Sequence, residues 1–89
     1  MNHTYLEVTF RHGKALAAYL YLPRRTGDSA VRTVKAEAGL LVDFSADDRP
    51  IGIEITAPRQ LNLVALNRIL SELHQPLATQ ADLAPLLAA

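Results

Sequence analysis

A change of hydrophobic period near residue 57 constrains the fold of this chain more than any other feature. Up to Thr56, apolar and polar residues alternate in several short runs, such as the run YLEVTF that begins at Tyr5. Alternation places successive side chains on opposite faces of a β-strand. From Leu61 to His74, apolar residues instead recur at steps of three and four, which is the spacing of one helical face. The pattern predicts a sheet followed by a helix that covers it.

Five runs alternate in this way, at residues 4–10, 17–23, 30–38, 40–45 and 50–56. Turn residues separate them, such as His12-Gly13-Lys14 and Gly27-Asp28. Short connections between consecutive strands favour an antiparallel β-meander. In the run at 30–38 the two valines fall on opposite faces, so we expect this strand to lie at an edge or to contain a bulge.

Helix boundaries follow from polar residues and prolines. Asn62 can cap the main helix and Pro76 stops it. Thr79 and Asp82 form a variant of the capping box, which predicts a short second helix. Pro85 fits that helix only within its first turn. We therefore predict one α+β domain over residues 1–89, with the sheet at about 5–56 and helices at about 62–75 and 80–87.

Composition narrows the class of protein. Nine basic and nine acidic residues cancel, so we expect no nucleic acid and no membrane as partners. The absence of cysteine excludes disulfides and thiolate metal sites and fits a cytoplasmic protein. No apolar run approaches the roughly 20 residues of a membrane span. A chain of 89 residues has a thin core, which association often supplements.

The segment VDFSADDRPIGIEI, residues 42–55, has the ligand spacing of a helix–loop–helix calcium site. Oxygen side chains occupy loop positions one, three, five and twelve, at Asp43, Ser45, Asp47 and Glu54. The sixth position needs glycine for a sharp turn and is Asp48, and both flanks alternate as strands do. We therefore predict a hairpin that turns at residues 47–50, with Asp43 opposite Glu54 on the outer face and no metal site.

That register raises a question about the outer face. Two carboxylates opposite each other on neighbouring strands repel. Either a cation such as Lys35, Arg32 or Arg49 lies between them, or the face binds something. Tyr5 and two further tyrosines also fall on this face, where they either cover a wetted sheet or anchor an interface, in which tyrosine is enriched. The candidate residues of this face are Tyr19, Tyr21, Asp43 and Glu54.

The C-terminal segment LAPLLAA supplies a second candidate surface. Its leucines, Leu83, Leu86 and Leu87, are too apolar to remain in water on so short a segment. They must dock on this domain, on a second copy or on another protein. We predict homodimer contacts as the alternative to docking on the same domain.

Motifs of catalysis and cofactor binding are absent from the sequence. His3, His12 and His74 lie in three different elements without ligand spacing, and there is neither a nucleophile elbow nor a glycine-rich phosphate loop. We therefore expect no catalytic residue, cofactor or metal. The favoured hypothesis is a non-enzymatic interaction module that forms homodimers. The alternative is a small-ligand or divalent-cation binder, or a minor hydrolase, that uses Asp43 and Glu54.

Two segments resemble the domain-of-unknown-function family 2283, which comprises small bacterial domains. Its members pair a segment like Asp-Ala-Leu-Tyr-Ile-x-Leu with a later Val-Asp-Tyr-Asp-x-x-Gly-x-x-Val-Gly-Ile-Glu-Ile. The matching residues here are Tyr19, Leu20, Leu22, Val42, Asp43, Phe44, Gly52, Ile53, Glu54 and Ile55. The chain departs from the pattern at Leu16, Ser45 and Asp48. The resemblance implies no established activity, but some members are encoded beside small toxin-like proteins, which implies an antitoxin-like role with a toxin as partner.

Overall fold

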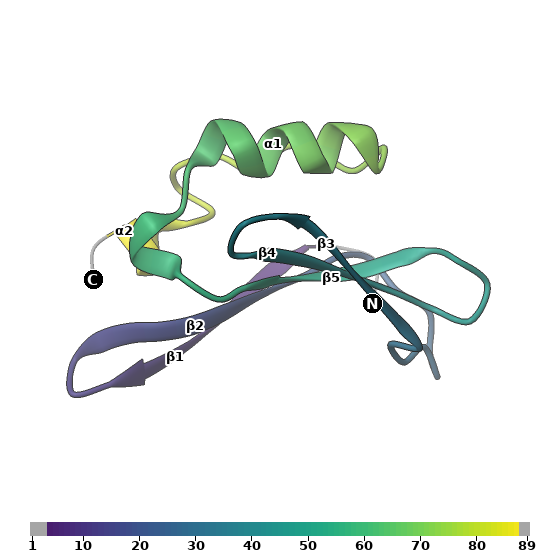
Figure 1. Ribbon diagram of the computed structural model, residues 1–89, viewed down its shortest axis with the longest axis horizontal. Coiled ribbons are helices and arrows are strands. Elements are labelled where there is room, and N and C mark those ends of the chain that lie inside the picture. Colours follow the sequence, from purple (N-terminus) through teal and green to yellow (C-terminus); the bar gives the residue numbers. More distant parts are fainter. Residues whose placement is uncertain (1–3, 88–89) are drawn as a thin grey trace.

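The structure, a computed structural model, describes residues 4–87 and, for Leu87, the backbone alone. A five-stranded antiparallel sheet forms one layer, and the helices lie over one of its faces (Figure 1). The α+β class predicted from the period change is confirmed. The elements are β1 (Tyr5–Arg11), β2 (Lys14–Tyr21), β3 (Arg32–Glu37), β4 (Leu40–Phe44), β5 (Pro50–Ile55), the 3-10 turn η1 (Pro58–Gln60), α1 (Leu63–Glu72) and α2 (Ala84–Leu87).

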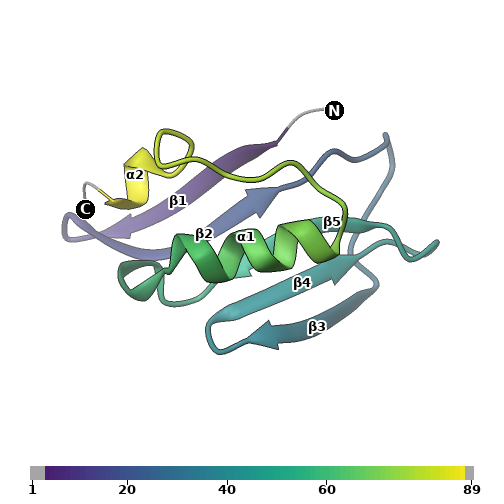
Figure 2. The same cartoon turned by 90° about the horizontal axis from the view of Figure 1, so that it is seen from above.

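The strands do not follow one another as a simple meander. Their order is β1-β2-β5-β4-β3, so β5 lies between β2 and β4 (Figure 2). Residues 22–31 carry the chain from β2 to the far edge of the sheet, where β3 pairs with β4 alone. The predicted edge position and irregularity of this strand are confirmed, because its register shifts between Lys35 and Glu37. The strand order is a correction to the predicted meander.

Two tight turns set the registers of the hairpins. His12 and Gly13 both have positive φ, 52° and 75°, as two-residue turns of type I′ require. The β4–β5 turn is shorter than predicted: the Ser45 amide donates to the Arg49 carbonyl at 2.9 Å, which leaves residues 46–48 as the loop. Asp48 takes the left-handed position of that loop, with φ of 61°.

The shorter turn and a bulge between Asp43 and Phe44 together move the β4–β5 register by two residues. Asp43 lies opposite Gly52, and Glu54 lies opposite Leu41. The predicted pairing of Asp43 with Glu54 is therefore wrong. Because strand side chains alternate with period two, a shift of two leaves every side chain on its predicted face. The inner face is confirmed for the three isoleucines of β5, which are at most 1% exposed.

Helix α1 begins as predicted and ends earlier. Asn62 caps it, since its Oδ1 accepts the amides of Val64 and Ala65 at 2.8 and 3.2 Å. The last helical residue is Glu72 rather than residue 75, because His74 adopts a left-handed φ of 58°. The Gln75 amide then donates to the Leu70 carbonyl at 2.8 Å, which completes a Schellman motif before Pro76 is reached.

The C-terminal segment is only partly helical. Thr79 and Asp82 form the predicted reciprocal cap: the Thr79 amide donates to Asp82 Oδ2 at 2.8 Å and the Asp82 amide donates to Thr79 Oγ1 at 3.2 Å. Turns follow, and α2 covers four residues rather than the predicted 80–87, with Pro85 in its single turn. Asn67 of α1 fastens the segment, because its amide group exchanges two hydrogen bonds with the backbone of Ala78 at 2.8 and 3.0 Å.

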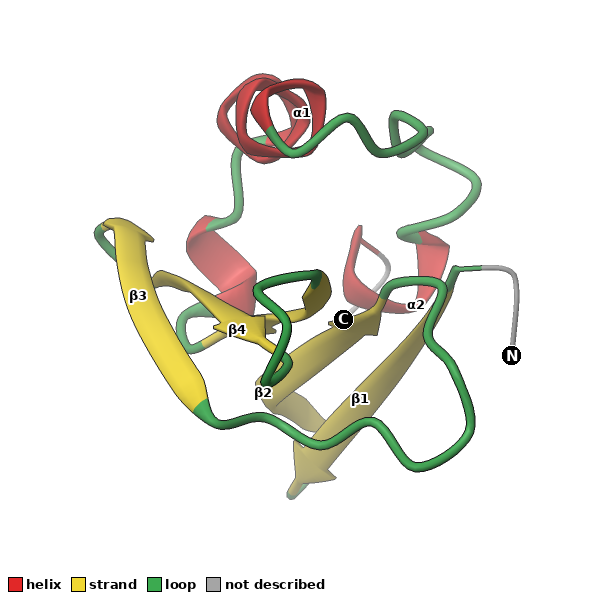
Figure 3. Cartoon of the chain, turned by 90° about the vertical axis from the view of Figure 1, so that its right-hand side faces the viewer, coloured by secondary structure: helices red, strands yellow, loops and turns green. Residues whose placement is uncertain are grey.

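The core lies between the sheet and the helical layer. Figure 3 shows these two layers from the end. From α1, Leu66 and Leu70 are at most 1% exposed. From the tail, Leu83 and Leu86 are 0% and 3% exposed. They meet the inner-face leucines, isoleucines and valine of β2, β4 and β5 in one cluster. The sheet's other face is left without a helical cover, and this face holds the predicted site residues.

Candidate interaction face of the sheet

Two rows of side chains cross the helix-free face of the sheet. Strand registers define them, because residues opposite each other on neighbouring strands share a face. The first row is Tyr5, Tyr21, Gly52, Asp43 and Thr33, and the second is Glu7, Tyr19, Glu54, Leu41 and Lys35. The four predicted candidate residues of this face therefore lie close together, on three adjacent strands.

Tyr19 lies diagonally across Gly52 and reaches the next strand but one. Its hydroxyl donates to Asp43 Oδ2 at 2.8 Å. A methyl group at residue 52 would overlap the phenol ring and oxygen of Tyr19, so this path exists only because residue 52 is glycine. Thr33 Oγ1 donates to the other oxygen of Asp43 at 2.6 Å. Both oxygens of this carboxylate, in a residue only 8% exposed, thus have a donor.

Burial raises the pKa of Tyr19, and the hydrogen bond to Asp43 and the negative charge of that carboxylate raise it further. A hydrogen bond from Arg24 opposes this change only in part. A proton held this firmly makes Tyr19 a hydrogen-bond donor and a poor general base. The arrangement positions the tyrosine ring rather than activating its oxygen.

Tyr5 and Tyr21 form the exposed half of the same face. Their rings stack with centroids 4.5 Å apart and 13° between planes, and Tyr19 meets Tyr21 edge-on at 4.7 Å. The Arg24 guanidinium lies 5.0 Å from the centre of the Tyr21 ring and donates to the Ile51 carbonyl at 2.6 Å. We call Tyr5, Tyr19, Tyr21 and Arg24 the tyrosine cluster. Stacked and edge-on rings add about 0.5–1.5 kcal/mol per pair beyond the burial of their area.

The outer-face acids do not form the predicted pair. Asp43 is held by Tyr19 and Thr33, while Glu54 lies one row away, opposite Tyr19 and Leu41. The repulsion expected between two directly opposite carboxylates does not arise in this register. Within residues 4–87, no three histidine or acidic side chains converge on a point where a metal ion would fit. The geometry lacks the predicted pairing of Asp43 with Glu54, and the cation and hydrolase hypothesis stays a prediction.

Arg49, predicted as a possible partner of the outer-face acids, instead joins two loops. Its guanidinium makes two hydrogen bonds with Asp28, at 2.7 and 2.9 Å, and one with Asp47 at 2.8 Å. These contacts lower the pKa of both carboxyls and raise the pKa of Arg49. The network fastens the β2–β3 connection to the β4–β5 turn, so its role is structural.

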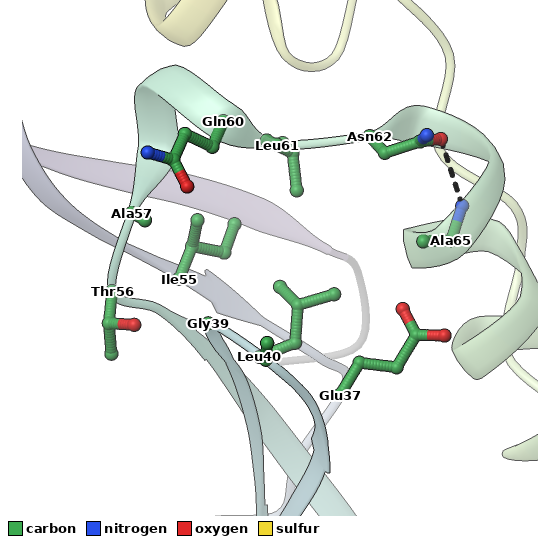
Figure 4. A pocket seen from close by; sticks show the side chains of 11 residues that line it. Glu37, Gly39, Leu40, Ile55, Thr56, Ala57, Gln60, Leu61, Asn62 and Ala65 are labelled. Atoms are coloured by element: carbon green, nitrogen blue, oxygen red, sulfur yellow. Dashed lines mark hydrogen bonds between the residues drawn. The ribbon is translucent and has the colours of Figure 1, made fainter.

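A pocket of about 290 Å³ lies between the β3–β4 turn and the start of α1 (Figure 4). Two of its polar residues are already engaged. Asn62 caps α1, and Glu37 accepts a hydrogen bond from Arg68 at 3.0 Å. The rest of the lining is largely apolar, for example Leu40 and Ile55. The pocket therefore carries no set of groups for acid–base or nucleophilic chemistry.

The predicted interface leucines of the tail have a different role. Leu83 and Leu86 belong to the core of the domain itself, so they are not exposed to a second copy. The side chain of Leu87 lies outside the described residues. Docking on the same domain was one of the alternatives for this tail, and Asn67 explains how it is achieved.

No protein-family model, curated protein or solved structure matches this chain. The resemblance to family 2283 therefore stays a prediction. None of the helices within residues 4–87 has the length and apolar character needed to cross a lipid bilayer.

Residues that the sequence patterns did not indicate complete the face. Thr33 and Arg24 became part of it through strand order and loop path, neither of which periodicity reveals. Gly52 did give a signal, because a glycine within the alternating run PIGIEI suggests a close approach by another group. The group that approaches is Tyr19, and only the tertiary structure identifies it.

Proposed function

We propose that this protein is a non-enzymatic protein-interaction module that forms a homodimer through the free edge of β1. The observation that carries the proposal is the contrast between the two edges of the sheet. β1 is seven residues long, contains no proline and has two charged side chains, Glu7 and Arg11. An edge of this kind offers unpaired backbone groups to a second strand.

The opposite edge is protected. β3 carries Arg32, Lys35 and Glu37 within six residues and has an irregular register. Charges and irregularities are the devices by which natural sheets prevent edge pairing. The register of β1 also shifts, between Thr9 and Phe10, but the residue left unpaired there is Leu16 of β2. The stretch of β1 between its two charges, from Val8 to Phe10, carries no charge of its own.

Exposed apolar side chains accompany the β1 edge. Phe10 is 50% exposed, and Tyr5 at the other end of the strand is 41% exposed. Beside the strand lies a groove of about 360 Å³ between β1 and the C-terminal segment, with Leu6 among its lining residues and Leu77, 58% exposed, at its rim. This side of the domain therefore has apolar surface to gain from a neighbour.

The strand can pair with itself in an antiparallel register. With Val8 on the two-fold axis, Leu6 lies opposite the partner's Phe10 on the helix side. On the outer face Tyr5 lies opposite the partner's Arg11, which suits a cation–π contact. The register centred on Glu7 would place like charges opposite each other, which is unfavourable. An isologous contact of this kind closes as a dimer and does not extend into a fibre.

The expected dimer is weak. Seven residues at about 3.4 Å each and a contact about 20 Å deep bury roughly 500 Å² per chain, or about 1,000 Å² in total. That area lies at the lower limit of specific interfaces. We therefore expect a dissociation constant on the order of 10 µM.

Sedimentation velocity across the micromolar range tests the dimer. Phe10→Lys should weaken it by about tenfold or more, because it buries a charge opposite Leu6. The matched control is Val34→Lys on the β3 edge, where the native side chain is 41% exposed. Circular dichroism of both variants checks that they fold. A wild-type monomer at all concentrations, or an equal effect of the two variants, would contradict the proposal.

The register has its own test, because the chain contains no cysteine. Val8→Cys places two thiols opposite each other at the axis, at about 5.5 Å between Cα atoms, which a disulfide can span. Thr9→Cys would be cross-linked only if the register were displaced by two residues. We expect oxidation to yield a covalent dimer of the first variant and not of the second.

Dimerisation would join two sheets into one continuous outer face, with a tyrosine cluster on each side of the axis. Tyrosine and arginine are the residue types that interfaces favour. We propose this face as the surface for a protein partner. That the partner is a toxin rests on the resemblance to family 2283 alone. Capture of a protein partner that is lost on Tyr21→Ser and retained on Val34→Lys would support this part of the proposal.

A further inference from the structure

A second pocket lies at the opposite end of the sheet from the Arg49 network, at the tip of the β1–β2 hairpin. Its volume is about 360 Å³, and it opens between the hairpin and η1. The lining residues are Arg11, His12, Lys14, Ala15, Leu16 and Arg59. Three of these six side chains are Lys or Arg, and none is acidic. The hairpin tip, up to Leu16, and η1 are separated by more than forty residues in sequence, so the fold alone creates this cluster.

The basic residues of this pocket differ from most others in the chain because they form no ion pairs within residues 4–87. Of the nine Lys and Arg residues in the chain, four form ion pairs within residues 4–87: Arg25, Arg32, Arg49 and Arg68. Arg24 belongs to the tyrosine cluster. Within the same described range, the remaining four, Arg11, Lys14, Lys35 and Arg59, have no ion pair. Three of those four line the one pocket at the hairpin tip. In a chain of zero net charge, this concentration leaves a local excess of about three positive charges.

We propose that this pocket binds a single phosphate group. Guanidinium groups present N–H donors in a planar fork that matches two phosphate oxygens, and the lysine ammonium adds a point charge. Arg11 and Lys14 lie opposite each other across the hairpin, and Arg59 of η1 lines the same pocket, so two elements contribute its cations. A dianion relieves the repulsion among three cations, which a single carboxylate would relieve less.

The arrangement favours one phosphate group over a polymer backbone. Nucleic-acid surfaces extend a basic stripe along the path of the strand. Here Phe10 and Leu16, 50% and 55% exposed, lie beside the cluster and carry no charge. The fourth unpaired cation, Lys35, lies on β3 at the far edge of the sheet. The cations are therefore confined to one small site. Because this site is open to solvent, we expect a dissociation constant of about 1 mM for an isolated phosphate group.

The phosphate group can belong to a free anion or to a lipid headgroup, and two arms of one experiment separate these sources. In the first arm, the ¹⁵N-labelled chain is titrated with inorganic phosphate and, in parallel, with sodium chloride at matched ionic strength. Saturable amide shifts at residues 11–16, 57, 59 and 60, larger with phosphate than with chloride, are the expected result. In the second arm, co-sedimentation compares vesicles of phosphatidylcholine alone with vesicles that also contain phosphatidic acid.

Charge-removing variants localise the site. Arg59→Ala should weaken phosphate binding by about three- to tenfold, because it removes one of three cations from a solvent-accessible site. Lys35→Ala is the matched control, since it removes an unpaired cation from β3, and it should leave binding unchanged. Neither side chain makes a hydrogen bond within residues 4–87, so we expect both variants to fold. The dispersion of the amide spectrum checks that each variant is folded.

Each outcome decides the proposal. Phosphate binding that Arg59→Ala weakens supports it with a free anion as ligand. Binding to phosphatidic acid vesicles alone, again weakened by Arg59→Ala, supports it with a lipid headgroup as ligand. No difference from chloride together with no vesicle binding overturns it. An equal loss on Lys35→Ala overturns it as well, because the binding would then follow net charge rather than this pocket. Arg59, the residue that the test varies, takes no part in the proposed β1 contact, so its effect on phosphate binding does not depend on the dimer.

Discussion

Replacing Gly52 by alanine tests how the outer face is built. A methyl group at this position would overlap the ring and oxygen of Tyr19, which lies across the glycine. The ring must therefore move, and its hydrogen bond to Asp43, now 2.8 Å long, is lost. Thr33 remains as the second donor to that carboxylate. The substitution changes only one methyl group, so its cost measures the close packing of tyrosine on glycine.

The expected destabilisation is about 1–2 kcal/mol. A hydrogen bond to a charged group contributes about 1.5–3 kcal/mol, and its loss leaves the acceptor, in a residue 8% exposed, with one donor fewer. Alanine opposes this loss by about 0.5–1 kcal/mol, because glycine loses more backbone freedom on folding. For a domain of this size, the net cost lowers the melting temperature by about 5–15 °C.

Urea unfolding of a double-mutant cycle is the appropriate assay. Tyr19→Ala removes the ring, so in that background Gly52→Ala should have no cost and should stabilise by up to about 1 kcal/mol. Tyr19→Phe keeps the ring but loses the hydrogen bond to Asp43, so it separates the cost of the steric overlap from the cost of the lost hydrogen bond. The reasoning fails if Gly52→Ala stays within about 0.5 kcal/mol of the wild type, or if its cost is the same with and without the Tyr19 ring.

Three further predictions concern the tail, its attachment and the Arg49 network. Leu83→Ala should cost about 3–5 kcal/mol in urea unfolding, because the side chain is fully buried in the core, and a cost below about 1 kcal/mol would place the tail elsewhere. Asn67→Ala should cost about 1–2 kcal/mol, since two backbone groups lose their partners, and hydrogen exchange of the C-terminal segment should accelerate. Arg49→Leu should be destabilised at neutral pH. The folded-state pKa values of Asp28 and Asp47 are lowered, so their contribution is present above the ordinary carboxyl pKa of about 4 and is lost as pH falls. The difference in stability between wild type and variant should therefore shrink on acidification, and a difference independent of pH would contradict the assignment.

Much of the local structure could be predicted from residue patterns. Alternation identified the faces of the strands, and Asn62 marked the start of α1. Thr79 and Asp82 form the expected reciprocal cap, although turns follow it and α2 begins only at Ala84. These features depend on residues close in sequence, and each has a direct physical cause in strand or helix geometry. The early end of α1 is also a local feature, because it is caused by the left-handed conformation of His74. Histidine does not favour that conformation strongly enough for the helix end to be predicted.

The candidate site could be predicted only in part. Tyr19, Tyr21, Asp43 and Glu54 do share one face, as alternation required. Their mutual contacts depended on a hairpin register that differed by two residues. Asp48 adopts a positive φ and shortens the turn, and a bulge between Asp43 and Phe44 sets the rest of the register. Alternation cannot reveal a register shift of two residues, because such a shift changes the cross-strand partner of each residue but leaves its side chain on the same face of the sheet. The sequence pattern therefore placed the right residues together and paired them wrongly.

The amino-acid sequence by itself determined that this chain forms an antiparallel sheet with one covered face and one open face, because the polarity of neighbouring residues dictates which side of a strand or helix meets water. Only the tertiary structure decided the strand order, the contact of Tyr19 with Asp43 across Gly52, and the meeting of Arg59 with the β1–β2 hairpin. These contacts join residues 24 and more positions apart. They follow from loop paths and registers, which the packing of the whole domain selects and no local pattern specifies.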